Sequence, residues 1–172
     1  FVVGQGASSS ASAQNVAADE LPQRKYADFL HLPHGLDGFF EYNEALAYAR
    51  KVNKPLFVDF TGHGCVNCRE MEARVWSDPR VLDMLKNDFV IVALYTDDKT
   101  RLLEEDQVTD AQTGKVYKDL GRANSYIART NWNVNAQPNY ILLSPEGEML
   151  APVRGYDLDI DGFIEFLRSG LK

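Results

Sequence analysis

The first half of the chain alternates between two spacings of apolar residues. Leu46, Ala49 and Val52 recur every third residue, which places them on one face of a predicted helix. Pro55 prevents that helix from continuing. Residues 55–60, PLFVDF, form a short apolar run of the kind found in strands that are covered on both faces of a sheet. A helix followed at once by a buried strand is therefore expected.

A second alternation of helix and strand begins at the first cysteine of the chain. Residues 65–76 have the pattern of a helix that opens at this cysteine. A further helix is predicted over residues 77–88, with Ser77 as its N-cap and Pro79 in its first turn. Residues 89–98, FVIVALYTDD, are typical of a second buried strand.

A polar insertion separates this second strand from the next helix. Residues 98–120 are mostly polar, and the turn signal at Thr113–Gly114 predicts a hairpin within them. Residues 122–134 then follow a helical pattern in which Tyr126 and Ile127 are expected to face inward. Two acidic stretches, TDD at residues 96–98 and EED at residues 104–106, are expected to be solvated rather than to bind a cation.

The last part of the chain predicts a hairpin and a closing helix. Residues 139–156 contain two strand-like runs around the turn at Pro145–Gly147, which indicates an antiparallel hairpin. Residues 157–172 close the chain with an amphipathic helix. Strands that alternate with helices and end in a hairpin predict an α/β fold with a central mixed sheet flanked by helices.

Composition and charge restrict the classes of protein that fit this pattern. The 172 residues are 45% hydrophobic, which is enough for one sizeable core. A formal charge of −7 and the lack of any basic run argue against nucleic acid or an anionic membrane as partners, because both attract clusters of Lys and Arg. Residues 1–20 are rich in Ser, Ala and Gly. We predict a flexible linker and lead-in segment at 1–35 and a single, monomeric domain at 36–172.

The strongest chemical signal is the pair of cysteines, Cys65 and Cys68, which are the only two in the chain. The first thiol is expected at the N-terminus of a helix, where unpaired backbone N–H groups favour the thiolate. The second lies about one turn further in and is less exposed. Cys65 is therefore expected to attack a substrate disulfide, and Cys68 to resolve the mixed disulfide by forming a Cys65–Cys68 bond.

Two other interpretations of the cysteine pair remain open from the residues alone. A structural zinc site needs two further ligands, for which the chain offers only His31, His34 and His63. A permanent structural disulfide is the other alternative, although so small a loop removes little chain entropy. We expect no metal, and no cofactor other than the redox-active disulfide itself.

Three residues outside the cysteine motif are candidates for the same site. Asp59 lies within an apolar strand, so burial is expected to raise the pKa of its carboxyl and let it exchange a proton with Cys68. The alternative is an aspartate that only binds backbone amides of the next turn. Pro138, which directly precedes a strand, is placed to turn the Gln137 main chain toward substrate, or to be an ordinary trans proline.

Two stretches of the chain resemble segments of thioredoxin. LFVDFTGHGCVNC, residues 56–68, resembles the active-site strand and turn of thioredoxin, and NAQPNYILLSPEGE, residues 135–148, resembles its cis-proline segment and terminal hairpin. More narrowly, GCVNCREMEARVWSDPRV, residues 64–81, is similar to the C-terminal thioredoxin-like domain of the DsbD family of membrane thiol:disulfide interchange proteins. The resemblance implies a thioredoxin-like fold with an insertion before the cis-proline segment.

The resemblance also implies a function and a location. In the DsbD family the cysteine pair accepts electrons from a transmembrane domain and passes them to periplasmic disulfide partners, which include the family's own N-terminal domain. The resemblance further implies that Asp59 and Glu70 are the carboxylates that tune the cysteine pair. Without the resemblance, Glu70 is equally consistent with a solvated glutamate on the helix. The alternatives are a free-standing periplasmic isomerase or cytochrome c maturation reductase, and a zinc-loaded or structural-disulfide binding module.

Two features beside the cysteines depart from the thioredoxin pattern. Gly64 stands where a tryptophan commonly precedes the first cysteine, and His63 comes before it, so the substrate-binding surface is expected to be less apolar. His63 is expected either to be a solvent-exposed loop residue or, when protonated, to lower the pKa of the thiol. Val66 and Asn67 carry no charge, which favours a potential near the reducing end of this class.

Overall fold

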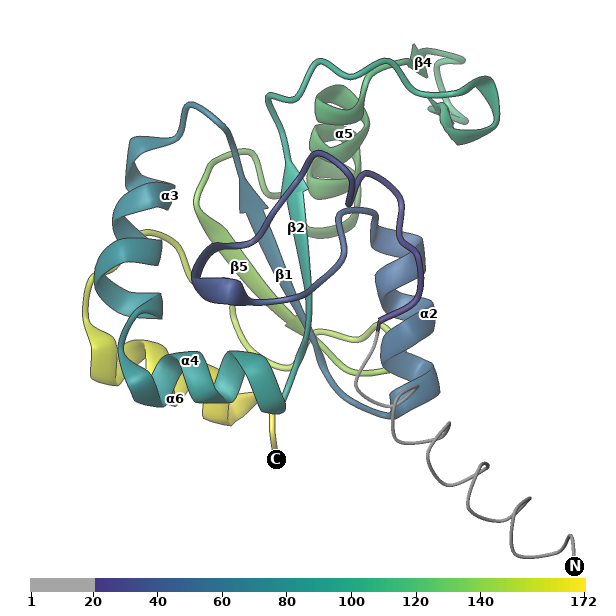
Figure 1. The fold of residues 1–172 in the computed structure, drawn as a ribbon. Helices are drawn as coiled ribbons and strands as arrows, with labels where there is room; N and C mark the ends of the chain where they lie inside the picture. The colour runs from purple at the N-terminus through teal and green to yellow at the C-terminus, as the bar shows by residue number, and fades with distance from the viewer. Residues whose placement is uncertain (1–20) are drawn as a thin grey trace, which may run out of the picture.

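The core of the fold is a three-stranded mixed sheet with the order β2-β1-β5. In the computed structural model, which describes residues 21–172, β1 (Leu56–Thr61) is the central strand. It pairs in parallel with β2 (Val90–Tyr95) and antiparallel with β5 (Asn139–Leu143). Figure 1 shows all three strands side by side between helices, so the predicted mixed sheet is confirmed.

Helices cover both faces of this sheet (Figure 1). One face carries α3 (Val66–Met71), a following π-helical turn (Glu72–Trp76), α4 (Pro79–Asn87) and α6 (Ile160–Ser169). The other face carries α2 (Tyr42–Val52) and α5 (Leu120–Trp132). Because successive strand residues point to opposite faces, β1 contributes side chains to two separate cores.

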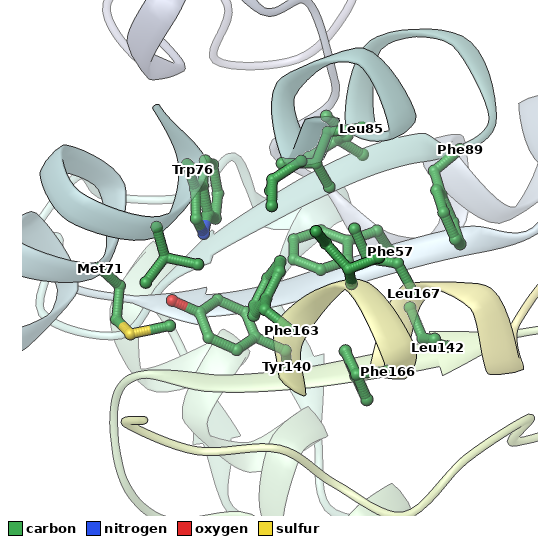
Figure 2. Close-up of a cluster of buried hydrophobic side chains, with 14 of the residues drawn as sticks. Phe57, Met71, Trp76, Leu85, Phe89, Tyr140, Leu142, Phe163, Phe166 and Leu167 are labelled. Atoms are coloured by element: carbon green, nitrogen blue, oxygen red, sulfur yellow. The ribbon is translucent and has the colours of Figure 1, made fainter. Parts of the chain in front are cut away.

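Phe57 lies at the centre of the core beneath α3, α4 and α6 (Figure 2). Its ring contacts Trp76 at a centroid distance of 5.7 Å and stacks on Tyr140 at 5.4 Å. Phe163 of α6 closes the group, with its ring 6.2 Å from Phe57. These aromatic contacts join the helices to the middle of the sheet, and they hold in place the strand that leads to the cysteines.

The N-cap of α4 differs from the prediction. Asp78, not Ser77, caps the helix, and its carboxylate accepts a hydrogen bond from the backbone N–H of Arg80 at 2.9 Å. Ser77 still has helical backbone angles from the preceding turn, whereas an N-cap requires an extended residue. Its hydroxyl instead donates to the Ala73 carbonyl at 2.7 Å. Pro79 occupies the first turn as expected.

The returning chain after β5 does not form a continuous strand. It makes two isolated bridges, Tyr140 with Arg154 and Leu143 with Met149. Two residues separate these positions in β5, but four separate them on the returning side, so the returning chain bulges. Pro152 lies in the bulge and has no N–H to donate to a ladder. The predicted antiparallel direction is correct, and the predicted second strand is wrong.

The insertion forms the expected hairpin and changes the face that α5 buries. A short 3₁₀ turn (Glu104–Asp106) precedes β3 (Val108–Thr109) and β4 (Val116–Tyr117), which pair antiparallel and project beyond α5 in Figure 1. The ring of Tyr117 stacks on that of Tyr126 at 4.7 Å. Tyr126 is therefore only half-buried against the insertion. The inward face of α5 is formed instead by small residues, among them Ala123 and Ala128.

The segment before α2 packs onto the sheet. Leu30 is buried, and Phe39 forms a parallel bridge with Val92 at the free edge of β2. A 3₁₀ turn (Pro33–Gly35) lies between them. The linker predicted for residues 1–20 falls outside the described residues, so the division at residue 35 stays a prediction. Within residues 21–172, the helices are too short or too polar to traverse a lipid bilayer.

Candidate active site

The two cysteines meet at the start of α3, where the chain turns from β1 into the helix. Cys65 is the extended N-cap residue, and its Sγ accepts a hydrogen bond from the Cys68 backbone N–H at 3.2 Å. The sulfurs are joined in a disulfide, with the two Cα atoms 5.2 Å apart. Cys65 is partly exposed, whereas Cys68 is 1% exposed. One sulfur is thus accessible to a partner, and the other is shielded.

Asp59 is a buried carboxyl on the strand that leads to the cysteines. It lies on β1 opposite Ala93 and Tyr140 and is only 3% exposed. Burial raises its pKa well above the ordinary value for aspartate, and the charge of Glu72 raises it further. The guanidinium of Arg69 acts in the opposite direction. Asp59 is therefore a carboxyl that retains its proton to higher pH than a solvated aspartate.

Glu72, which the sequence analysis missed, is the second carboxylate of this site. It forms an ion pair with Arg69 at 3.1 Å, and partial burial raises its pKa. Glu70 instead faces the solvent side, where Tyr156 donates to it and Arg74 lies 3.0 Å away; these two bonds lower its pKa. The structure thus couples Glu72, rather than Glu70, to the buried aspartate.

Helical spacing carries a signal that distinguishes the two glutamates. Residues four apart lie on the same face of a helix, whereas residues two apart do not. Glu72 is four residues after the buried Cys68, and Glu70 is two residues after it. Only Glu72 therefore shares the face of Cys68, which is turned toward the sheet.

The segment before β5 leads into a strand whose first residue, Asn139, pairs with Phe60 near the end of β1. The Gln137–Pro138 peptide bond is cis, which the residues alone left open, and Pro138 is buried. Gln137 is half-buried and borders a small cavity of about 130 Å³. The cavity is lined by residues of β1, α5 and the adjoining loops: Phe60, Thr96, Ser125, Ala128, Arg129, Val134, Asn135 and Gln137.

The loop between β1 and Cys65 is bound to the acidic turn that follows β2. The backbone N–H groups of His63 and Gly64 donate to the carboxylate of Asp97, and His63 Nε2 lies 2.7 Å from Asp98 Oδ2. Burial opposes ionisation of both aspartates, but hydrogen bonds to their carboxylates outweigh it and lower the pKa of each. The expectation of a solvated carboxylate is therefore wrong for Asp98, which is buried, whereas Asp97 is exposed and still binds the loop.

The geometry gives no support to a zinc site. Among residues 21–172, no group of three or more His, Cys, Asp or Glu side chains is arranged to hold a metal ion. Cys65 and Cys68 are bonded to each other, and His34 Nε2 is hydrogen-bonded to the Glu72 carbonyl at 2.7 Å. Both sulfurs and the His34 imidazole are therefore engaged in contacts of another kind.

Comparison with known proteins agrees with the fold and the motif. A family model of the thioredoxin-like domain matches residues 42–170. Among curated proteins, the thiol:disulfide interchange protein DsbD of Salmonella typhi is 41% identical over 56 residues, which is 33% of this chain. The matched segment covers only 10% of that relative, so the likeness concerns one part of a much longer protein.

Solved structures share the fold along most of the chain. A DsbH oxidoreductase aligns with a TM-score of 0.57 at 19% identity, covering 92% of this chain and 97% of its own. A thioredoxin from Thermus thermophilus aligns at 0.54 with 25% identity, covering 76% and 84%. The oxidised C-terminal domain of DsbD from Neisseria meningitidis aligns at 0.50 with 20% identity, covering 78% and 99%.

Proposed function

Since the chain belongs to the thioredoxin-like domain family, we propose that it reduces protein disulfides by thiol–disulfide exchange at Cys65 and Cys68. The observation that carries this proposal is the disulfide at the head of α3, with one sulfur partly exposed and the other buried. A substrate reaches only the outer sulfur. The inner sulfur is held within bonding distance of the outer one and can complete the exchange.

The reaction transfers two electrons to the substrate in two displacement steps. In the reduced protein, the Cys65 thiolate attacks one sulfur of a substrate disulfide; the substrate S–S bond breaks, and the departing thiolate takes up a proton. The product is a mixed disulfide through Cys65. Cys68 then loses its proton and attacks the Cys65 sulfur, which releases the second substrate thiolate and forms the Cys65–Cys68 disulfide.

Asp59 is assigned to the proton transfer that activates Cys68, and Glu72 to tuning the pKa of Asp59. A buried thiol ionises reluctantly, so the second step needs a nearby base. The raised pKa of Asp59 suits this role, because its carboxyl exchanges a proton at a pH closer to neutrality than an ordinary aspartate does. Glu72 acts on Cys68 indirectly, since its charge raises the pKa of Asp59.

Gly64, Gln137 and Pro138 are assigned to substrate binding. Gly64 is exposed directly before Cys65 and has no side chain to obstruct an approaching peptide. Gln137 is half-buried, and the cis bond to Pro138 directs its main chain at the start of β5. None of these three residues carries a charge, so their contacts can accommodate peptides of varied sequence.

The electron donor and acceptors are proposed by analogy with the DsbD relative. On this proposal the domain accepts electrons from a membrane domain and passes them to disulfides in the periplasm, including those of an N-terminal domain of the same protein. No cofactor beyond the cysteine pair takes part. The uncharged Val66 and Asn67 support the reducing direction, because a cation between the cysteines would stabilise the thiolate and raise the potential.

Reduction of insulin with dithiothreitol as the electron source tests the proposal. The wild-type domain is expected to accelerate precipitation of the insulin B chain, and Cys65→Ser to return the rate to the uncatalysed background. Refolding of scrambled ribonuclease measures the alternative isomerase activity and is expected to be the weaker of the two. Undiminished insulin reduction by Cys65→Ser would rule out exchange at this sulfur.

A further inference from the structure

The carboxylate of Asp97 binds the loop that leads directly to the nucleophile. Its Oδ1 accepts from the backbone N–H of His63 at 2.7 Å, and its Oδ2 accepts from that of Gly64 at 2.9 Å. The two oxygens of one charged group thus bind the N–H groups of consecutive residues, and the second of these residues, Gly64, directly precedes Cys65. Hydrogen bonds to an ionised acceptor are stronger than those between neutral groups.

The turn that carries Asp97 is itself fixed to the sheet and to α5. The backbone N–H of Thr96 donates to the Thr61 carbonyl at 2.9 Å, and its hydroxyl donates to the same oxygen at 3.1 Å. On the far side of the turn, Gly121 N–H donates to the Asp98 carbonyl at 2.8 Å. A Cβ atom at Gly121 would lie 2.7 Å from the Thr96 carbonyl oxygen, so this close packing requires glycine. The carboxylate is therefore presented from a rigid support.

Gly62 allows the active-site loop to approach this carboxylate closely. A Cβ atom at this position would lie 3.1 Å from Asp97 Oδ2 and 3.3 Å from Oδ1, which is tighter than ordinary van der Waals contact. Gly62 itself is buried, whereas Asp97 is exposed, so a Cβ atom here would have to displace the carboxylate by a few tenths of an ångström. A side chain here would push the loop and the carboxylate apart.

A second contact holds the same loop through its side chain. His63 Nε2 lies 2.7 Å from Asp98 Oδ2, and the imidazole stacks on the ring of Tyr95 with centroids 4.4 Å apart. Asp98 is buried, and its other oxygen accepts from the Thr100 N–H at 2.9 Å. The loop is thus tied by its backbone to one aspartate and by its side chain to the next.

We propose that Asp97 is a positioning residue that fixes the loop at residues 62–64 and thereby presents Cys65 to the disulfide of a protein substrate. This inference rests on the proposed function. A protein disulfide must align with the attacking sulfur while its chain docks on the surrounding surface, so an ordered loop lowers the cost of forming the complex. A small reagent has no such docking surface, and its reaction with Cys65 depends little on the loop.

This difference between large and small reactants provides the test. Asp97→Asn replaces one of the two acceptor oxygens by an amide NH2 group, which donates, and removes the charge. We expect kcat/KM for insulin reduction to fall at least about tenfold. The plateau rate of Cys65 alkylation by iodoacetamide, measured at a pH where the thiol is fully ionised, is expected to stay within about twofold of wild type.

Asp110→Asn is the matched control for the change in charge. Asp110 also binds a backbone N–H in its own turn, that of Gln112 at 2.9 Å, but it lies in the insertion hairpin. We expect its insulin kinetics to equal those of wild type. Gly62→Ala is a second variant that leaves every charge in place, and it is expected to lower insulin kcat/KM in the same way as Asp97→Asn.

Amide hydrogen exchange separates failure of this inference from failure of the proposed function. The amides of His63 and Gly64 are expected to exchange faster in Asp97→Asn than in wild type, a readout that needs no catalysis. Faster exchange with a selective loss on insulin supports the positioning role. Unchanged insulin kinetics, or an equal loss toward insulin and iodoacetamide, overturns it, whereas a wild-type protein inactive on insulin refutes only the proposed function.

Discussion

Arg69 forms an ion pair with Glu72 at 3.1 Å, at the point where α3 passes into the π-helical turn. The same guanidinium donates to the Thr61 hydroxyl at 2.8 Å, so it joins the helix to the end of β1. The buried carboxyl of Asp59 lies two residues earlier on that strand. Two carboxyl groups and one cation therefore lie close enough for their charges to act on one another.

Neutralising Glu72 is expected to change the pH dependence of catalysis. The negative charge of Glu72 raises the pKa of Asp59, so Glu72→Gln should lower that pKa. If ionised Asp59 accepts the Cys68 proton, the acidic limb of the profile of kcat/KM for insulin reduction moves to lower pH. Glu70→Gln is the matched control, because Glu70 faces solvent and bonds Tyr156 and Arg74. A shift in the control variant, or none with Glu72→Gln, contradicts this assignment.

Asp59→Asn is expected to stabilise the oxidised protein near neutral pH. The pKa of Asp59 is raised in the folded state, so between its unfolded and folded values the native protein binds more protons than the unfolded chain. Wild-type stability therefore falls as pH rises through this window, by up to about 1.4 kcal/mol per pH unit. Asparagine has no ionisable carboxyl, so the variant does not lose stability in this pH window.

Urea unfolding measured from pH 4 upward checks this prediction. The free energy of unfolding of Asp59→Asn should exceed that of wild type by a margin that grows with pH and then levels off above the folded pKa. Asp110 serves as a control, because backbone and side-chain hydrogen bonds lower its pKa rather than raise it. A margin that shrinks with increasing pH for Asp59→Asn would show that the pKa of the buried carboxyl is lowered, not raised, on folding.

Removing the ring of Phe57, at the centre of the core beneath α3, α4 and α6, is expected to lower the stability of the fold strongly. Phe57 is fully buried and contacts Trp76, Phe89, Tyr140 and Phe163. Phe57→Ala should lower the free energy of unfolding by about 3–5 kcal/mol, because the surrounding rings cannot fill the cavity. Urea denaturation at constant pH measures the change, and a loss below about 1 kcal/mol would mean that the core repacks.

Neighbouring residues of the lead-in segment test whether that segment belongs to the folding unit. Leu30 is 3% exposed and packs with Phe40 and Tyr95, whereas the adjacent Phe29 is 43% exposed. Leu30→Ala should lower the free energy of unfolding by about 2–3 kcal/mol. Phe29→Ala should change it by less than about 0.5 kcal/mol. Equal effects of the two substitutions would place the segment outside the cooperative fold.

Much of the fold could be predicted from local patterns. The apolar runs of β1 and β2 and the helical spacing of α2 and α6 each depend on residues close in sequence, and all four elements are present. The helix opening at Cys65 was equally local, since the cysteine directly follows a strand and a turn. The irregular return after β5 also has a local signal, since Pro152 has no N–H to donate to a ladder.

The contacts that complete the site depend on the three-dimensional arrangement. Asp97 reaches His63 only because β1 and β2 pair in a register that sets Thr61 beside Tyr95, and no local pattern records that register. Helical spacing alone indicates that Glu72, and not Glu70, shares the face of Cys68, whereas the resemblance points to Glu70. Burial of Asp59 could be read from its strand, whereas the charges around it could not.

Trapping the mixed disulfide tests the central claim most directly. With Cys68→Ser, the second displacement cannot occur, so reaction with an oxidised protein substrate should leave a stable adduct that mass spectrometry locates on Cys65. With Cys65→Ser, the buried Cys68 should give no adduct under the same conditions. Adducts of similar yield in the two variants, or none with Cys68→Ser, would contradict a mechanism in which the outer sulfur attacks and the inner one resolves.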